Sequence, residues 1–165
     1  MFRDYLEKVR TNPWKIGESF ISGVPVTSVM GIVNVTPDSF FDGGKHNTLD
    51  AAYEHANKLL DEGALILDIG GESSRPGAKS VSAAEEIERV VPLVKRLVPL
   101  LSRKNFWISV DTVKSEVARE SMKAGAHIIN DISALEFDPN MAKTIAETHA
   151  SSVLNHMRGN FGTMQ

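Results

Sequence analysis

Residues 29–44 read VMGIVNVTPDSFFDGG, so an apolar, β-branched run leads directly into a loop of polar, aromatic and glycine residues. The run predicts a strand over residues 29–35 that is buried on both faces, because such strands read as continuous apolar stretches. Asn47 and Thr48 follow the loop and are typical of the start of a helix. Polar side chains between a buried strand and a helix are typical of functional sites in α/β proteins.

The same pattern of strand followed by helix recurs along the rest of the chain. Ser82 stands three residues before Glu85 in an N-cap pattern, and Asp138 precedes a proline at another expected helix start. Gly63 and Gly125 lie where helices are expected to end. The order predicts repeated β/α units around a parallel sheet. Strands are predicted over residues 29–35, 65–69, 107–110, 127–132 and 151–156, and helices over residues 48–62, 82–101, 114–124 and 139–148.

A polar residue lies at or near the end of each predicted strand, at Asn34, Asp68, Asp111, Asn130 and His156. The mean spacing is about 30 residues, which matches one unit of an eightfold β/α barrel. A doubly wound sheet would accept the same order of elements, and the spacing favours the barrel over it. We therefore predict an α/β protein of the TIM type, a (β/α)8 barrel of which this chain supplies about the first five strands and four helices.

The segment before the first barrel strand has a different character. Residues 1–11 are expected to form a leading helix, and residues 14–28 a short hairpin that plugs the lower end of the barrel. The predicted domains are therefore residues 1–28, an N-terminal helix with a barrel-plugging hairpin, and residues 29–165, a partial barrel.

Composition excludes several functional classes. Hydrophobic residues make up 42% of the 165 residues and charged residues 24%, which is typical of soluble globular proteins. A net charge of -3 without a basic cluster argues against nucleic-acid binding, and no apolar stretch has the length of a membrane span. The absence of cysteine excludes disulfides and thiolate metal sites. We expect a cytoplasmic protein that binds neither nucleic acid nor membrane.

The first two polar loops offer oxygen and cationic groups. The amide oxygen of Asn34 suits Mg²⁺, although an asparagine at a strand end also commonly caps its own turn. Residues 68–77 read DIGGESSRPG, in which Ser73, Ser74 and Arg75 favour an anion site. The alternative for Arg75 is a surface ion pair. Asp68 is expected to be structural and to brace this loop.

Two later strand ends place a carboxylate beside an amide. Asp111 and Asn130 suit the donor and acceptor edge of a heterocycle, because burying such groups without partners costs about 1–3 kcal/mol each. The alternative is that the neighbouring backbone satisfies both. Asp131 should point to the opposite face and be structural. His127 is expected to pack in the core. His156, at the end of a predicted strand, is the histidine that we expect could belong to a functional site.

Five segments together resemble dihydropteroate synthase. They are residues 30–40 (MGIVNVTPDSF), 68–77 (DIGGESSRPG), 109–112 (SVDT), 129–132 (INDI) and 156–159 (HMRG). The resemblance covers residues 29–165 and implies a (β/α)8 barrel. It implies an enzyme of folate biosynthesis that condenses 6-hydroxymethyl-7,8-dihydropterin diphosphate with p-aminobenzoate to give dihydropteroate and diphosphate.

The resemblance also implies roles for individual residues. Asn34 would hold Mg²⁺ on the diphosphate, and Asp111 and Asn130 would hydrogen-bond the pterin. Ile132 would lie against the pterin face, and Ser74 at the anion site. The remaining expected site residues are Ser73, Arg75 and Pro76 in a loop over p-aminobenzoate, and Phe40 and Asp42 in a second loop. Catalytic roles fall to Phe40, Asp42 and Arg75.

Some positions depart from the family pattern, and two other functions stay open. Phe41 stands where the family usually has a small and polar residue, and Ser74 where threonine is common. Asn155 occupies a position that is often apolar, and Phe161 one that is often proline. The family has further strands and site residues beyond the matched part, so the 165 residues alone are expected to be inactive, and the full-length enzyme to be a homodimer. The alternatives are a pterin-binding methyltransferase and a non-catalytic fragment that mediates interactions.

Overall fold

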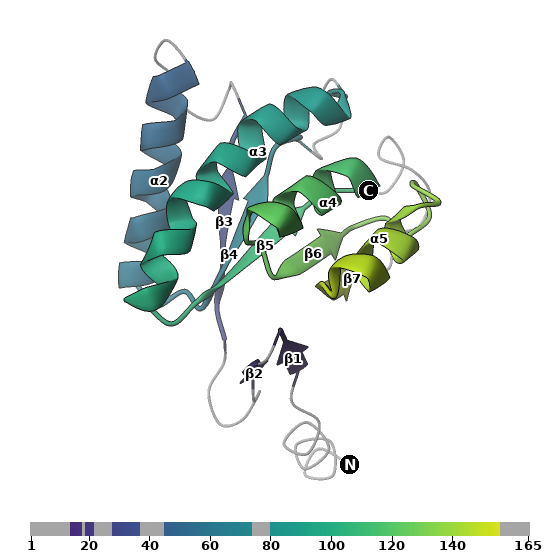
Figure 1. Ribbon diagram of the computed structural model, residues 1–165. Helices are drawn as coiled ribbons and strands as arrows, with labels where there is room; N and C mark the ends of the chain where they lie inside the picture. Colours follow the sequence, from purple (N-terminus) through teal and green to yellow (C-terminus); the bar gives the residue numbers. More distant parts are fainter. Residues whose placement is uncertain (1–13, 18, 22–27, 37–44, 74–79, 156–165) are drawn as a thin grey trace.

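The main sheet has five parallel strands, each hydrogen-bonded to the next along the chain (Figure 1). The computed structural model describes residues 14–17, 19–21, 28–36, 45–73 and 80–155. The predicted strands are confirmed, with ends that shift by a residue or two. They are β3 (Met30–Asn34), β4 (Ile66–Gly70), β5 (Trp107–Asp111), β6 (Ile128–Asp131) and β7 (Ser151–Leu154).

The strand order separates the barrel from the doubly wound sheet. The order is β3-β4-β5-β6-β7, so each strand lies beside its predecessor and the sheet never reverses direction. A doubly wound sheet reverses its order at a switch point, whereas a barrel adds strands in sequence. The structure therefore has the sequential parallel arrangement of the predicted barrel.

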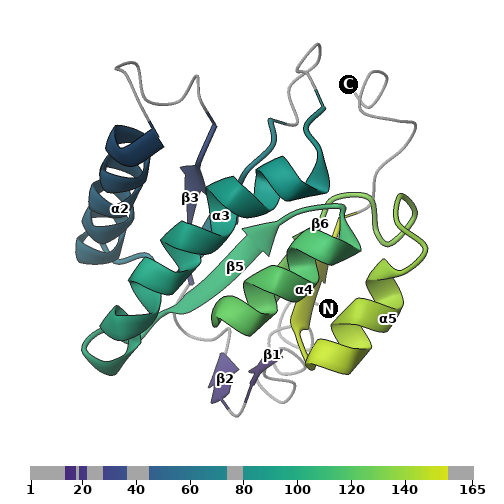
Figure 2. The same cartoon turned by 45° about the horizontal axis from the view of Figure 1, so that its top comes forward.

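The helices of the described part of the chain cover one face of this sheet (Figures 1 and 2). Val33, Ile69, Val110 and Ile129 point to that face, where they join one large buried cluster with side chains of the helices. No helix of the described ranges is long and apolar enough to cross a membrane. The helices are α2 (Lys45–Asp61), α3 (Ala83–Leu97), α4 (Ser115–Ala124) and α5 (Met141–Thr148).

Two helix boundaries differ from the prediction. Helix α2 begins at Lys45, three residues before the expected start at Thr48. The single helix expected over residues 82–101 ends at Leu97 and continues as a 3-10 helix, η2 (Val98–Ser102). Pro99 accounts for the change, because it has no N–H to bond to the carbonyl four residues earlier.

The helix ends follow their predicted caps in most cases. Ser82 Oγ accepts a hydrogen bond from the Glu85 N–H at 3.2 Å. Gly125 ends α4 at a φ of +110°, and a Cβ there would lie 2.5 Å from Val98 Cγ2, so only glycine fits.

The start of the last helix was predicted less well. Helix α5 begins at Met141 rather than at residue 139. The Asp138 carboxylate instead accepts hydrogen bonds from the N–H groups of Ser115, at 2.7 Å, and Asn140, at 2.9 Å. Asp138 therefore caps the preceding helix, α4, across 23 residues of sequence.

The other face of the sheet meets a hairpin at the amino ends of the strands (Figure 2). Strand β1 (Trp14–Ile16) pairs antiparallel with β2 (Ser19–Ile21). Ile16 is 1% exposed and belongs to a small buried cluster with Ile66 and Ile128. The expected helix over residues 1–11 lies outside the described residues, and the division at residue 28 stays a prediction.

Candidate functional site

Four polar or glycine positions form one row across the carboxyl ends of the strands. The Cα partners are Asn34 with Gly70, Gly70 with Asp111, and Asp111 with Asn130. Register partners in a parallel sheet project to the same face, so these residues share the face that the helices leave uncovered. The glycine opens the row, because a Cβ at Gly70 would lie 3.3 Å from Asn34 Oδ1 and 3.9 Å from Asp111 Oδ2. Both oxygens therefore border the same space above Gly70.

A second tier of polar side chains lies two residues below this row. Ser109 Oγ donates to Asp68 Oδ1 at 2.6 Å, and Asn130 Nδ2 donates to Asp68 Oδ2 at 2.9 Å. All three side chains are buried. Asp68 is structural, as predicted, but it braces Asn130 and Ser109 from inside the sheet. After β4, the carbonyl oxygen of Gly71 accepts a hydrogen bond from Arg89 instead.

These contacts leave acceptors open at the carboxyl ends. Asn130 Oδ1 is buried and has no hydrogen-bond partner in the described part of the chain. Burial, as the largest cause, and the negative charges of Asp68, Glu86 and Asp131 together raise the pKa of Asp111 to about 7. An unpartnered buried acceptor costs about 1–3 kcal/mol, so a ligand that supplies N–H donors here gains that much.

The neighbouring residue Asp131 has the opposite orientation. Its Oδ1 accepts from Ser133 N–H at 2.8 Å and from Ser133 Oγ at 2.7 Å, and its Oδ2 accepts from Leu135 N–H at 3.0 Å. The prediction that Asp131 is structural is therefore confirmed. It holds the turn that follows β6, in which Ala134 has a φ of 53°.

The described donor set limits the kind of metal that the site can hold. Among the described residues, no group of three or more His, Asp or Glu side chains has the geometry of a metal site. Asn34 is exposed at the end of β3, and its Oδ1 faces the space above Gly70. A single amide oxygen fits Mg²⁺, which commonly keeps several waters and binds substrate phosphates in place of a full protein cage.

Two of the other predicted site residues lie just after strands. Ser73 and Ile132 are both half-buried, after β4 and β6 respectively. The predicted residues that lie outside the described ranges are Phe40, Asp42, Ser74, Arg75, Pro76 and His156.

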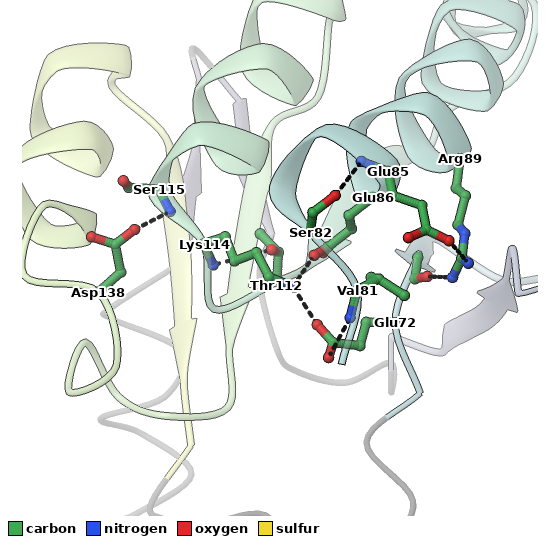
Figure 3. A network of polar contacts seen from close by, with 11 residues as sticks. Glu72, Val81, Ser82, Glu85, Glu86, Arg89, Thr112, Lys114, Ser115 and Asp138 are labelled. Atoms are coloured by element: carbon green, nitrogen blue, oxygen red, sulfur yellow. Dashed lines mark hydrogen bonds and ion pairs between the residues drawn. The ribbon is translucent and has the colours of Figure 1, made fainter. Parts of the chain in front are cut away.

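An ion network beside the site has no counterpart in the sequence prediction (Figure 3). Lys114, just before α4, contacts the carboxylates of Glu72, after β4, and Glu86, in the first turn of α3. Glu86 is 1% exposed. The sequence does contain one sign of this network. Glu86 stands four residues before Val90, which places a charged residue on the apolar stripe of α3.

Comparisons with known proteins agree with this geometry. A protein family described as pterin binding enzyme matches residues 30–165. Dihydropteroate synthase of Escherichia coli is 56% identical over 137 residues, which are 83% of this chain and 47% of that protein. The chain thus spans about half the length of the curated relatives it matches.

Solved structures show the same similarity. A Yersinia pestis dihydropteroate synthase in complex with a sulfonamide drug has a TM-score of 0.80 at 47% identity, over 93% of this chain and 54% of that one. A Xanthomonas albilineans dihydropteroate synthase in complex with 7,8-dihydropteroate has a TM-score of 0.75 at 41% identity, over 89% and 52%. The predicted resemblance is confirmed, and the chain belongs to the family of pterin-binding enzymes.

Proposed function

We propose that this chain is the N-terminal part of a dihydropteroate synthase, which condenses 6-hydroxymethyl-7,8-dihydropterin diphosphate with p-aminobenzoate. The observation that carries the proposal is the pair of open acceptors at Asp111 and Asn130. They are register partners on adjacent strands, and the acceptor end of Asn130 is fixed by its bond to Asp68. The complex of the Xanthomonas relative with 7,8-dihydropteroate supports this class of ligand.

The chemistry of a pterin matches these acceptors. Its amino group and ring N–H present donors side by side along one edge. The Asp111 carboxylate takes two such donors, and Asn130 Oδ1 takes another. Donation to the ionised form favours that form, so binding lowers the pKa of Asp111 from its raised value. Ile132 follows β6 and supplies an apolar contact for the flat ring.

The reaction forms a C–N bond and breaks a C–O bond. The nitrogen of p-aminobenzoate attacks the methylene carbon of the pterin, diphosphate leaves with the C–O electron pair, and the nitrogen loses a proton. Asp111 and Asn130 hold the ring so that this carbon is oriented for attack. Asn34 would hold Mg²⁺, which when bound neutralises charge on the departing diphosphate.

The other roles rest on the resemblance to the family. Ser73, Ser74, Arg75 and Pro76 are proposed to contact the anion and p-aminobenzoate, and Phe40 and Asp42 to act near the reacting carbon. We also propose a cytoplasmic enzyme that is a homodimer in its full length.

A chimeric enzyme tests the proposal. Residues 30–165 replace the matched segment of the Escherichia coli relative, and dihydropteroate formation is measured with and without p-aminobenzoate. We expect synthesis that depends on p-aminobenzoate, and no synthesis by the 165-residue chain alone. The Asp111→Asn chimera should lose most activity, while Asp61→Asn, a surface change of equal charge, should not.

The same assay separates the alternatives. Methyl transfer from a methylated pterin in place of condensation would establish the methyltransferase. A folded chimera that catalyses neither reaction would contradict the proposal and favour a non-catalytic role.

A further inference from the structure

Lys114 joins three elements that meet beside the candidate site (Figure 3). Its Nζ lies 2.5 Å from Glu86 Oε2 and also contacts Glu72 Oε2. Burial acts against its charge, but the hydrogen bonds to Glu72 and Glu86 outweigh it and raise the pKa of Lys114. The lysine therefore stays charged between two carboxylates, of which Glu86 is fully buried and Glu72 is 22% exposed.

Glu72 uses its second oxygen for a different contact. Glu72 Oε1 accepts a hydrogen bond from the Val81 N–H at 3.4 Å. Glu72 and Val81 stand on the two sides of residues 74–79, the sequence segment that contains Ser74, Arg75 and Pro76. One carboxylate thus connects the described residues on the two sides of that segment, and Lys114 contacts the carboxylate.

The backbone just before Glu72 is fixed independently. Arg89 Nη1 donates to the Gly71 carbonyl oxygen at 2.7 Å. A Cβ at Gly71 would lie 2.8 Å from Val90 Cγ2, so the chain passes directly against α3. With the backbone held by α3, the direction of the Glu72 side chain depends on Lys114, its closest polar partner.

We propose that Lys114 is a positioning residue that holds Glu72 and, through the Glu72 carboxylate, links the backbone at Glu72 to the backbone at Val81. The proposed role of Lys114 involves no contact with substrate. A lysine that only neutralised Glu86 would need one carboxylate, whereas this lysine reaches a second one outside the helix. The consequence for p-aminobenzoate rests on the proposed function, but the positioning itself does not.

Hydrogen exchange in the 165-residue chain tests the positioning directly. In Lys114→Met the amide of Val81 should exchange about tenfold faster, because its acceptor is no longer held. Lys114→Arg keeps the charge and should restore slow exchange. Lys104→Met removes an equal charge from an ion pair with Asp61 and should leave Val81 unchanged. Equal acceleration in Lys104→Met, or none in Lys114→Met, would overturn the proposal.

A second variant covers the case in which Lys114→Met does not fold. Glu72→Gln leaves the ion pair of Lys114 with the buried Glu86 in place. It removes the negative charge of Glu72, the second partner of Lys114. It should also accelerate exchange at Val81, with global stability measured by denaturation close to that of the wild type. Unchanged exchange at Val81 in this folded variant would equally overturn the proposal.

The chimera described above then separates positioning from general stability. We expect Lys114→Met to raise KM for p-aminobenzoate about tenfold while KM for the pterin diphosphate stays within about twofold. Lys114→Arg should recover most of the loss. An equal rise in both KM values would overturn the link to p-aminobenzoate. An inactive wild-type chimera would contradict the proposed function and leave the exchange result standing.

Discussion

Asn130 donates from Nδ2 to Asp68 Oδ2 at 2.9 Å, and this contact decides which end of the Asn130 amide stays open. Asp68 is 5% exposed and also accepts from Ser109, so its position is fixed inside the sheet. With the amino group committed to Asp68, the carbonyl oxygen of Asn130 has no partner in the described part of the chain. A residue that the sequence marked as structural therefore prepares the acceptor that a ligand would use.

Replacing Asp68 by alanine should weaken pterin binding without removing any group that touches the pterin. Asn130 and Ser109 would each lose a buried partner, which costs about 1–3 kcal/mol of stability per group and leaves the Asn130 amide free to turn. We expect roughly tenfold weaker pterin affinity, because an ordering cost then accompanies binding. Pterin titration and denaturant unfolding of the active chimera would measure the two effects.

Asp131→Ala is the matched control for that experiment. Asp131 is equally buried but accepts its hydrogen bonds from Ser133 and Leu135 on the other face of the sheet. It should lower stability by a similar amount and leave pterin affinity nearly unchanged. Equal losses of affinity in Asp68→Ala and Asp131→Ala would show that destabilisation alone explains the effect.

Asp111→Asn should make the unliganded chain more stable and the enzyme inactive. The folded pKa of Asp111 is about 7 against an ordinary 3.8, so the native state keeps a proton that the unfolded chain releases. The associated stability is complete below about pH 4 and is lost as the pH rises towards about 7. At about pH 8 the variant should gain roughly 1–3 kcal/mol, after allowance for solvent screening.

Denaturant unfolding at several pH values would measure this gain. Asp61→Asn, a change at an exposed carboxylate, should show the same dependence of stability on pH as the wild type. If the stability of Asp111→Asn declines between about pH 4 and 7 as that of the wild type does, then Asp111 is not the group with the raised pKa.

The sequence predicted the sheet well because most of its strands are rich in apolar residues and end at a polar residue or glycine. Strand β7, which reads SSVL, is the exception. For the same reason the sequence predicted that Asp111 and Asn130 lie together, because the carboxyl ends of parallel strands meet at one edge of the sheet. Helix ends were less certain, because Pro99 and the long-range cap at Asp138 act through contacts that periodicity does not record.

Lys114 was missed for a related reason. Its partners Glu86 and Glu72 lie 28 and 42 residues away and belong to another β/α unit. Glu86 also follows the N-cap Ser82 by four residues, where an acidic side chain has an ordinary explanation in the helix dipole. Its burial, which only packing reveals, distinguishes it from the exposed Glu85 beside it.

His127 should make the chain less stable in mild acid. Burial lowers the pKa of its ring, and the Ile108 N–H donates to Nδ1 at 3.1 Å, which requires an unprotonated Nδ1. A lowered pKa contributes stability that is complete above about pH 6.5 and is lost as the pH falls through the folded value.

The measurement is best made in the Asp111→Asn background, because Asp111 titrates over the same range with the opposite sign. Unfolding free energy should then fall from about pH 7.5 to 5, and His127→Phe should remove most of that slope. The same variant should cost about 1–2 kcal/mol near pH 7.5, where Ile108 loses its acceptor. An unchanged slope in His127→Phe would assign the acid sensitivity to another group.

Gly71→Ala should destabilise the chain by about 1–3 kcal/mol through overpacking. The added Cβ would lie 2.8 Å from Val90 Cγ2 and 2.9 Å from Glu86 Cγ, and both neighbours are fully buried. Glu86 is also held by Lys114, so it has little freedom to move away. Gly63→Ala is the control for backbone strain alone, because Gly63 has a φ of +102° and no described atom lies within 4 Å of its Cβ position.

A double-mutant cycle with Val90→Ala isolates the steric part of that cost. Shortening Val90 removes the nearest contact, so Gly71→Ala should cost at least about 1 kcal/mol less in the Val90→Ala background than in the wild type. Gly63→Ala should show no such dependence, since no described atom lies within 4 Å of its Cβ position. Denaturant unfolding of the four proteins in each cycle gives the coupling directly. If Gly71→Ala and Val90→Ala are additive, the close approach of the chain at Gly71 to Val90 does not limit this position.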